Sequence, residues 1–235
     1  MKKKILLLII LLASILLTVF ILKPFNKEKE ITDNIKFKQE YEKLNNDKNN
    51  INITINENNP FIYSNSKDII NKINNRESFI VYFGFSKCPY CRTILPSLIE
   101  VSEYLEVDKI YYVDISNVRD TIIINDNNEL ETTKEGTKEY NQLLDLLDNV
   151  LEEYTLEDKE GNTISTNKKR IYAPSVVAVV EGEIIDLETG LNDDLDITKE
   201  LSDEGKKDIY DKFYKILDDF KIRESMCGIN QDTGC

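Results

Sequence analysis

The spacing of apolar and polar positions divides the chain into three parts. Ile5–Leu22 is almost wholly apolar, and a helix of that length spans about 27 Å, close to the hydrocarbon thickness of a bilayer. Residues 23–59 are rich in Lys, Glu, Asn and Asp and contain no glycine. Strand and helix patterns follow from Pro60 onward. We therefore expect a membrane anchor at 1–22, a polar stalk at 23–59 and one folded domain at 60–225.

The flanks of the apolar run predict how the anchor is oriented. Lysines at positions 2–4 precede it, and such clusters stay on the cytoplasmic side of a membrane. A cleaved signal peptide is the alternative, but its apolar region is shorter and ends at small residues. Here Lys23-Pro24-Phe25 follows the run. The sequence favours an uncleaved, single-pass anchor with a cytoplasmic N-terminus and the domain outside the cell.

Within the stalk, Phe37, Tyr41 and Leu44 fall at helical spacing. We interpret this segment as a short helix at most, inside a solvated linker that lifts the domain off the membrane.

The first half of the domain has a strand–helix–strand pattern. Residues 61–63 suit a short strand, and Ser66 is a candidate N-cap for the helix that follows. Ser78–Phe83 predicts a buried strand, and an amphipathic helix comes after it. Lys109–Ile115 predicts a second buried strand. Strand, helix and strand in this order imply a parallel pair joined by a right-handed crossover.

The second half begins with an insertion at about 116–168 and ends with a long helix. The insertion is expected to be helical, with one apolar face packed on the sheet. An apolar strand then begins after Pro174, Glu181-Gly182 predicts a hairpin turn, and a helix at about 203–222 closes the domain. The apolar face expected in the insertion consists of Leu143, Leu147, Val150, Leu151 and Tyr154.

Composition removes several classes of function. The chain has 235 residues and a net charge of −13, which argues against nucleic-acid binding. It has no histidine, so His-based triads and His-ligated metals are excluded. No glycine-rich phosphate loop follows any strand. The acidic residues at 193–196 lack the glycine and glutamate of a calcium loop. We expect no metal and no cofactor.

The candidate chemistry lies in Cys88-Pro89-Tyr90-Cys91, between the central strand and its helix. Unpaired N–H groups and the helix dipole stabilise a thiolate at a helix start. Cys88 is therefore the expected exposed nucleophile, assisted by Lys87, and Pro89 suits the first helical turn. Cys91, one turn on, would resolve a mixed disulfide. The alternatives are a chance pair of core cysteines or half of a zinc site.

These residues resemble the thioredoxin superfamily. The Pro-Tyr dipeptide between the cysteines is typical of glutaredoxins, and Pro96 matches the helix-kinking proline of thioredoxins. The longer phrase from Phe83 to Pro96 is similar to thioredoxin-like bacteriocin transport accessory proteins. The resemblance implies an α/β fold with a central mixed sheet flanked by helices. It also implies that Pro174 is cis and faces the cysteines, that Ala173 offers its backbone to substrate, and that Tyr90 modulates the site.

The resemblance implies thiol–disulfide exchange on exported cysteine-containing peptides or proteins, including bacteriocins, with a redox partner in the membrane as a further expectation. One departure concerns Tyr82, which stands where thioredoxins keep a buried aspartate. The alternatives are a glutaredoxin-like reductase, faintly suggested by Thr189–Leu195, and a non-catalytic accessory module of an export system.

A second cysteine pair lies in the expected tail at 226–235. Cys227 and Cys235 are separated by a polar segment with a glycine beside each cysteine. A local disulfide, a four-cysteine zinc site with Cys88 and Cys91, and a redox relay all remain open, and the local disulfide is the prediction. Zinc sites use tighter spacings within each pair.

Overall fold

A five-stranded sheet with both parallel and antiparallel neighbours forms the centre of the protein. The computed structural model describes residues 31–47, 51–192 and 201–229. The strand order is β1-β3-β2-β8-β9, in which β1, β3 and β2 are parallel and β8 runs antiparallel to both of its neighbours, β2 and β9. The strands are β1 (Phe61–Tyr63), β2 (Phe79–Gly84), β3 (Ile110–Asp114), β8 (Ser175–Val180) and β9 (Glu183–Glu188).

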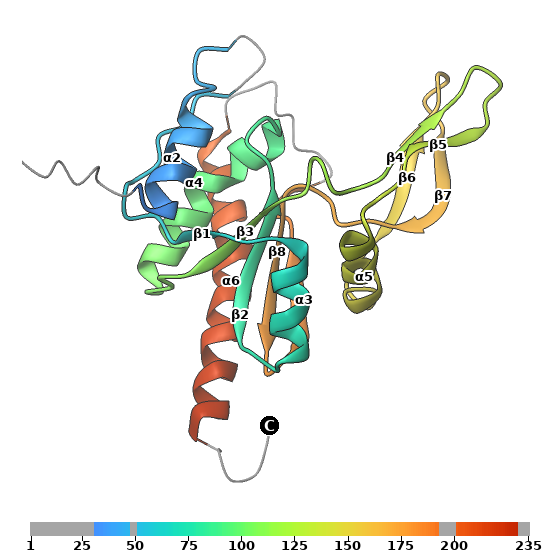
Figure 1. Ribbon diagram of the computed structural model, residues 1–235. Helices are drawn as coiled ribbons and strands as arrows, with labels where there is room; N and C mark the ends of the chain where they lie inside the picture. The colour runs from blue at the N-terminus through green and yellow to red at the C-terminus, as the bar shows by residue number, and fades with distance from the viewer. Residues whose placement is uncertain (1–30, 48–50, 193–200, 230–235) are drawn as a thin grey trace, which may run out of the picture. The chain divides into compact units, whose positions relative to one another are not determined.

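Helices cover both faces of this sheet (Figure 1). Helices α2 (Asp33–Glu42), α4 (Pro89–Tyr104) and α6 (Asp203–Ile229) contribute to the apolar cluster on one face. Helices α3 (Ser66–Asn74) and α5 (Lys138–Leu146) contribute to the cluster on the other. The expected α/β architecture, a central mixed sheet flanked by helices, is confirmed.

The central position of β2 follows from its sequence. Every residue of Phe79–Gly84 is buried, because a strand with helices on both sides has no solvent-facing side. Ile80 and Tyr82 point into the cluster with α4, and Val81 and Phe83 into the cluster with α3. β2 pairs in parallel with β3, as the strand–helix–strand pattern predicted.

The prediction of a solvated stalk is wrong for the described residues from 33 onward. Phe37 and Tyr41 of α2 are fully buried, and so is Ile55 in the segment that follows. The ring of Phe37 stacks on Phe61 of β1 at 4.0 Å between centroids. Composition misled here, because a few apolar residues suffice to dock a polar segment when one face of the helix carries them. Asp33, rather than Pro60, begins the folded unit.

The insertion is mainly β-structure, which corrects the expectation of a helical segment. It contains two antiparallel hairpins, and α5 ends at Leu146, before Val150 and Leu151. Tyr154 lies in a strand, where the Arg170 guanidinium covers its ring at 3.8 Å. The expected packing role of the helix is confirmed, because Leu143 joins the buried cluster. The hairpin strands are β4 (Thr121–Ile124), β5 (Leu130–Lys134), β6 (Glu153–Glu157) and β7 (Thr163–Lys169).

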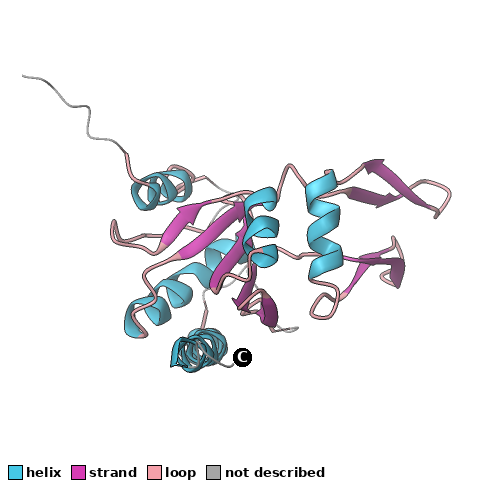
Figure 2. Ribbon diagram, turned by 60° about the horizontal axis from the view of Figure 1, so that its bottom comes forward, coloured by secondary structure: helices cyan, strands magenta, loops and turns pink. Residues whose placement is uncertain are grey.

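The two hairpins lie near each other beyond α5, as Figure 2 shows. Lys159, in the turn of the second hairpin, is paired with Asp126 of the first at 3.4 Å. At the base of the hairpins, Arg170 forms a largely buried ion pair with Asp120 at 2.8 Å. One ion pair therefore joins the turns of the two hairpins, and another joins the chain segments that flank them.

Several predicted boundaries shift. The N-cap of α3 is Asn65, whose side chain accepts from the Asp68 N–H at 3.0 Å, and not Ser66. The predicted turn at Glu181-Gly182 is confirmed, with positive φ at both residues. α6 continues to Ile229, into the segment expected to be a tail.

The predicted anchor at 1–22 and the acidic residues at 193–196 lie outside the described residues. Among the residues that are described, no helix combines the length and apolarity needed to cross a membrane.

Candidate functional site

The two predicted redox cysteines lie where β2 passes into α4. Cys88 is the N-cap of α4, with extended backbone angles, and Pro89 occupies the first helical position. The Cys91 backbone N–H donates to Cys88 Sγ at 3.3 Å. The sequence predicted this position at the start of a helix. There the sulfur accepts a hydrogen bond from one of the unpaired N–H groups of the first turn, as a capping side chain does.

Ala173 and Pro174 lie against the first cysteine, although they are far away in sequence. Cys88 Sγ donates to the Ala173 carbonyl at 3.3 Å, and the Ala173–Pro174 bond is cis. Both expectations for this loop, the cis bond and its proximity to the cysteines, are confirmed. One prediction is wrong: the sequence predicted that Cys88 is exposed, but it is buried, with only 4% of its surface accessible.

The surroundings lower the pKa of the Cys88 thiol below its ordinary value. The leading cause is its hydrogen bond with Cys91, which outweighs the opposing effect of burial. The N–H groups of Cys91 and Tyr90 and the positive charge of Arg119 act in the same direction. The expected helper, Lys87, is exposed, and the cationic contribution comes from Arg119. The sequence offered no local signal for Arg119, which enters the site from the start of the insertion.

Cys91 has the opposite character. It is fully buried, and burial raises its pKa well above the ordinary value, with its hydrogen bond to Cys88 acting in the same direction. The neighbouring Tyr82 hydroxyl partly offsets this rise. A nucleophile favoured as thiolate beside a resolving thiol favoured as neutral is the asymmetry that dithiol exchange uses.

Gly84 makes room for the side chain of Tyr82. A Cβ at Gly84 would overlap the hydroxyl of Tyr82, two residues earlier on the same strand face. Glycine therefore allows this fully buried phenol to reach Cys91 and Tyr41, whose hydroxyl lies 3.3 Å away. Sequence reasoning identified Tyr82 as a departure but gave it no part in the site.

The remaining predicted residue of the motif, Tyr90, is 40% exposed. It lies directly after Pro89 in the first turn of α4, so an exposed ring stands between the two cysteines in the chain.

Arg92, which follows the motif, is a second residue that sequence reasoning missed. Its side chain is almost fully buried, yet its partners are neutral oxygens. It donates to the carbonyls of Ile51, Tyr41 and Ser86 and to the side-chain oxygen of Asn45, at 2.5 to 3.3 Å. Arg92 thereby joins the segment around α2 to the loop before Cys88.

The second cysteine pair is only partly described. Cys227 lies in α6 and takes part in a disulfide. Cys235 lies outside the described residues, so the Cys227–Cys235 pairing stays a prediction, which mass spectrometry of a non-reduced digest tests. In the described part of the chain, no cluster of cysteine and acidic side chains has the arrangement of a metal site.

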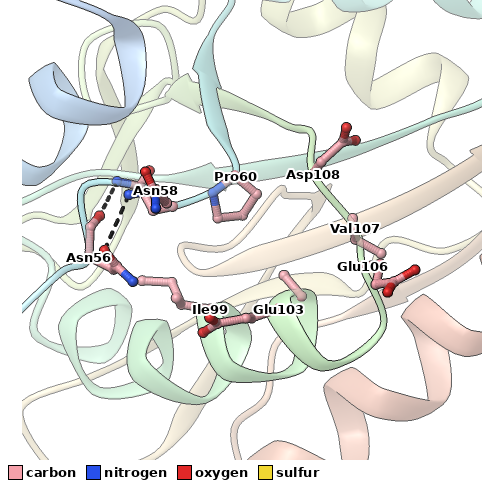
Figure 3. Close-up of a pocket in the computed structure, with 10 residues that line it drawn as sticks. Asn56, Asn58, Pro60, Ile99, Glu103, Glu106, Val107 and Asp108 are labelled. Atoms are coloured by element: carbon pink, nitrogen blue, oxygen red, sulfur yellow. Dashed lines mark hydrogen bonds between the residues drawn. The ribbon is translucent and has the colours of Figure 1, made fainter.

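A pocket of about 420 Å³ lies apart from the cysteines, between α4 and the chain entering β1 (Figure 3). Glu103, Glu106 and Asp108 give it an acidic side, and Asn56 and Pro60 face them. None of the candidate site residues lines it.

Comparison with known proteins finds no matching family model and no curated protein of significant similarity. Arguments about function therefore depend on the residues and geometry described above.

Proposed function

We propose that this chain is a thiol–disulfide oxidoreductase of the thioredoxin superfamily. The observation that carries the proposal is the position of Cys88. Its sulfur caps α4, accepts the Cys91 N–H and contacts the Ala173 carbonyl next to cis Pro174. The mixed sheet flanked by helices is compatible with a thioredoxin-like fold.

Within that class, we propose that the protein is a membrane-anchored, extracytoplasmic enzyme. Its substrates would be exported peptides or proteins that contain cysteine, and its relatives would be the thioredoxin-like bacteriocin transport accessory proteins. The apolar run after the N-terminal lysines and the phrase around the cysteines support this.

The proposed exchange proceeds in two displacements. Cys88 thiolate attacks one sulfur of a substrate disulfide, forming a mixed disulfide while the other substrate sulfur leaves as thiolate. Cys91 thiolate then attacks Cys88 Sγ, the protein disulfide forms, and the second substrate sulfur leaves. The substrate gains two electrons and the protein loses them. The same steps in reverse oxidise a substrate dithiol.

Trapping of the mixed disulfide tests the proposal. Cys91→Ser should hold a disulfide-containing peptide as a covalent adduct on Cys88 that a reductant releases, because the resolving thiol is absent. Cys88→Ser should form no adduct, and Cys227→Ser should turn over like the wild type. Failure of Cys91→Ser to trap, or turnover by Cys88→Ser, would overturn the assignment.

A non-catalytic accessory module is the second candidate, favoured by the low exposure of Cys88, 4%. An export phenotype that survives replacement of both Cys88 and Cys91 by serine would establish it over the enzyme.

A further inference from the structure

Cys91 is sealed from water, although its proposed role requires it to exchange a proton. It is fully buried. In the proposed reaction it must lose its proton before attacking Cys88, and must regain one in the reverse direction. Thioredoxins use a buried aspartate at this point, and here the position holds Tyr82.

A continuous series of hydroxyl groups leads away from Cys91. The hydroxyl of Tyr82 of β2 lies close enough to Cys91 to lower the pKa of that thiol, and it is 3.3 Å from the hydroxyl of Tyr41 of α2. Tyr41 in turn neighbours Tyr112 of β3, with 6.2 Å between the centroids of their rings. The Tyr112 hydroxyl donates to Glu40 Oε1 at 3.2 Å. Each of the three phenols can therefore accept one hydrogen bond and donate the next.

Packing holds these hydroxyls in place. Tyr41, Tyr82 and Tyr112 are each 0% exposed. The rings of Tyr82 and Tyr112 stack with centroids 5.7 Å apart, and Tyr41 contacts Tyr112 edge-on at 6.2 Å. Phe37 packs against Tyr41 at 4.6 Å. Because these rings are buried and packed against one another, their hydroxyl groups need no further ordering at each turnover.

The outer end of the series reaches solvent at Glu40. This side chain is only partly buried, and Tyr63 donates to its second carboxylate oxygen. The charged groups around this end are Asp33 of α2, Asp114 of β3 and Lys36, whose ammonium lies over the Tyr63 ring. A carboxylate in contact with water can accept a proton from Tyr112 and release it.

We propose that Tyr82, Tyr41, Tyr112 and Glu40 form a proton path between Cys91 and solvent. The proposal rests on the thiol–disulfide exchange proposed above. When Cys91 is deprotonated, its S–H proton passes to the Tyr82 oxygen while Tyr82 passes its own proton on. Each phenol gains one O–H bond and loses one, and Glu40 takes the last proton and releases it to water.

The phenols carry protons without ionising. Burial raises the pKa of Tyr41, Tyr82 and Tyr112, so each stays neutral at physiological pH. Transfer must therefore be concerted along the series. Run in reverse, it delivers a proton to Cys91 when that sulfur leaves, so the path serves either direction of electron flow.

The second displacement can be timed directly in the full-length chain. A background of Cys227→Ser and Cys235→Ser leaves only Cys88 and Cys91 to react. With dithiobis-nitrobenzoate, attack by Cys88 releases one coloured thiolate, and attack by Cys91 on the mixed disulfide releases a second. Stopped-flow absorbance separates the two releases.

Removal of a path residue should slow only the second release. Tyr82→Phe and Glu40→Gln should each slow it about 100-fold, the size expected for assisted proton transfer, and leave the first release unchanged. Tyr111→Phe, on the opposite face of β3, is the control and should change neither. In the wild type, the second release should slow in D₂O, with a curved dependence on deuterium content because several protons move together.

Three outcomes would overturn the path: a second release unaffected by Tyr82→Phe and Glu40→Gln, equal slowing of both releases, or no solvent isotope effect in the wild type. A wild type that releases no second thiolate at all would instead overturn the proposed oxidoreductase function.

Discussion

Truncation of Arg92 should destabilise the protein strongly and expose the buried thiol of Cys91. Arg92→Ala deletes a buried guanidinium that makes four hydrogen bonds, three to backbone carbonyls and one to Asn45. At a net value of about 1 kcal/mol for each, the free energy of unfolding should fall by about 4 kcal/mol. That is a large share of the ~5–15 kcal/mol typical of folded domains.

Urea denaturation followed by far-ultraviolet circular dichroism measures this loss. With a denaturant slope of about 2 kcal/mol/M, the midpoint should move down by about 2 M. Arg92→Lys should recover part of the loss, because an ammonium reaches fewer of the four acceptors. The control is Arg223→Ala, which removes an exposed pair with Asp219 at 2.8 Å and should shift stability by less than about 1 kcal/mol.

A local readout separates this role from a general one. Arg92 joins the segment around α2 to Ser86, so its loss should loosen the cover over Cys91. In native conditions, alkylation of Cys91 should become faster in Arg92→Ala and stay slow in Arg223→Ala. Equal midpoints for the two variants, or a Cys91 that stays equally protected, would refute the reasoning.

Three further predictions follow from the site. Arg119→Ala should raise the pKa of Cys88 and so lower its thiolate fraction below the wild-type value at any pH near that pKa; the pH dependence of iodoacetamide labelling measures it, and an unshifted curve contradicts it. Gly84→Ala should lower stability by about 1–3 kcal/mol, because the added methyl overlaps the Tyr82 hydroxyl; thermal unfolding measures it, and a neutral effect contradicts it. Protease added to intact protoplasts should remove the domain and protect a stub containing residues 1–22; recovery of a soluble, processed chain argues against the anchor.

Local patterns determined the centre of the fold and the first half of the site. A fully apolar run, a glycine and a helical repeat in succession place Cys88 and Cys91 at a strand-to-helix junction, whatever the rest of the chain does. The order of strand, helix and strand then specifies a parallel pair. The placement of Pro174 came from resemblance, since the residues alone do not show which distant loop faces the cysteines.

Tertiary contacts alone decided what surrounds the two thiols. Tyr41 and Tyr82 are 41 residues apart in sequence, Arg92 and Asn45 are 47 apart, and Cys88 and Ala173 are 85 apart. The segment carrying Tyr41 and Asn45 looked like a stalk, because its few apolar residues are separated by Lys, Glu and Asn. Its burial depends on the apolar surface that Phe61 of β1 and Tyr112 of β3 offer to Phe37, and periodicity does not show this surface. Hydrophobic spacing specifies which face of a helix is apolar, but only the folded chain provides the surface that this face covers.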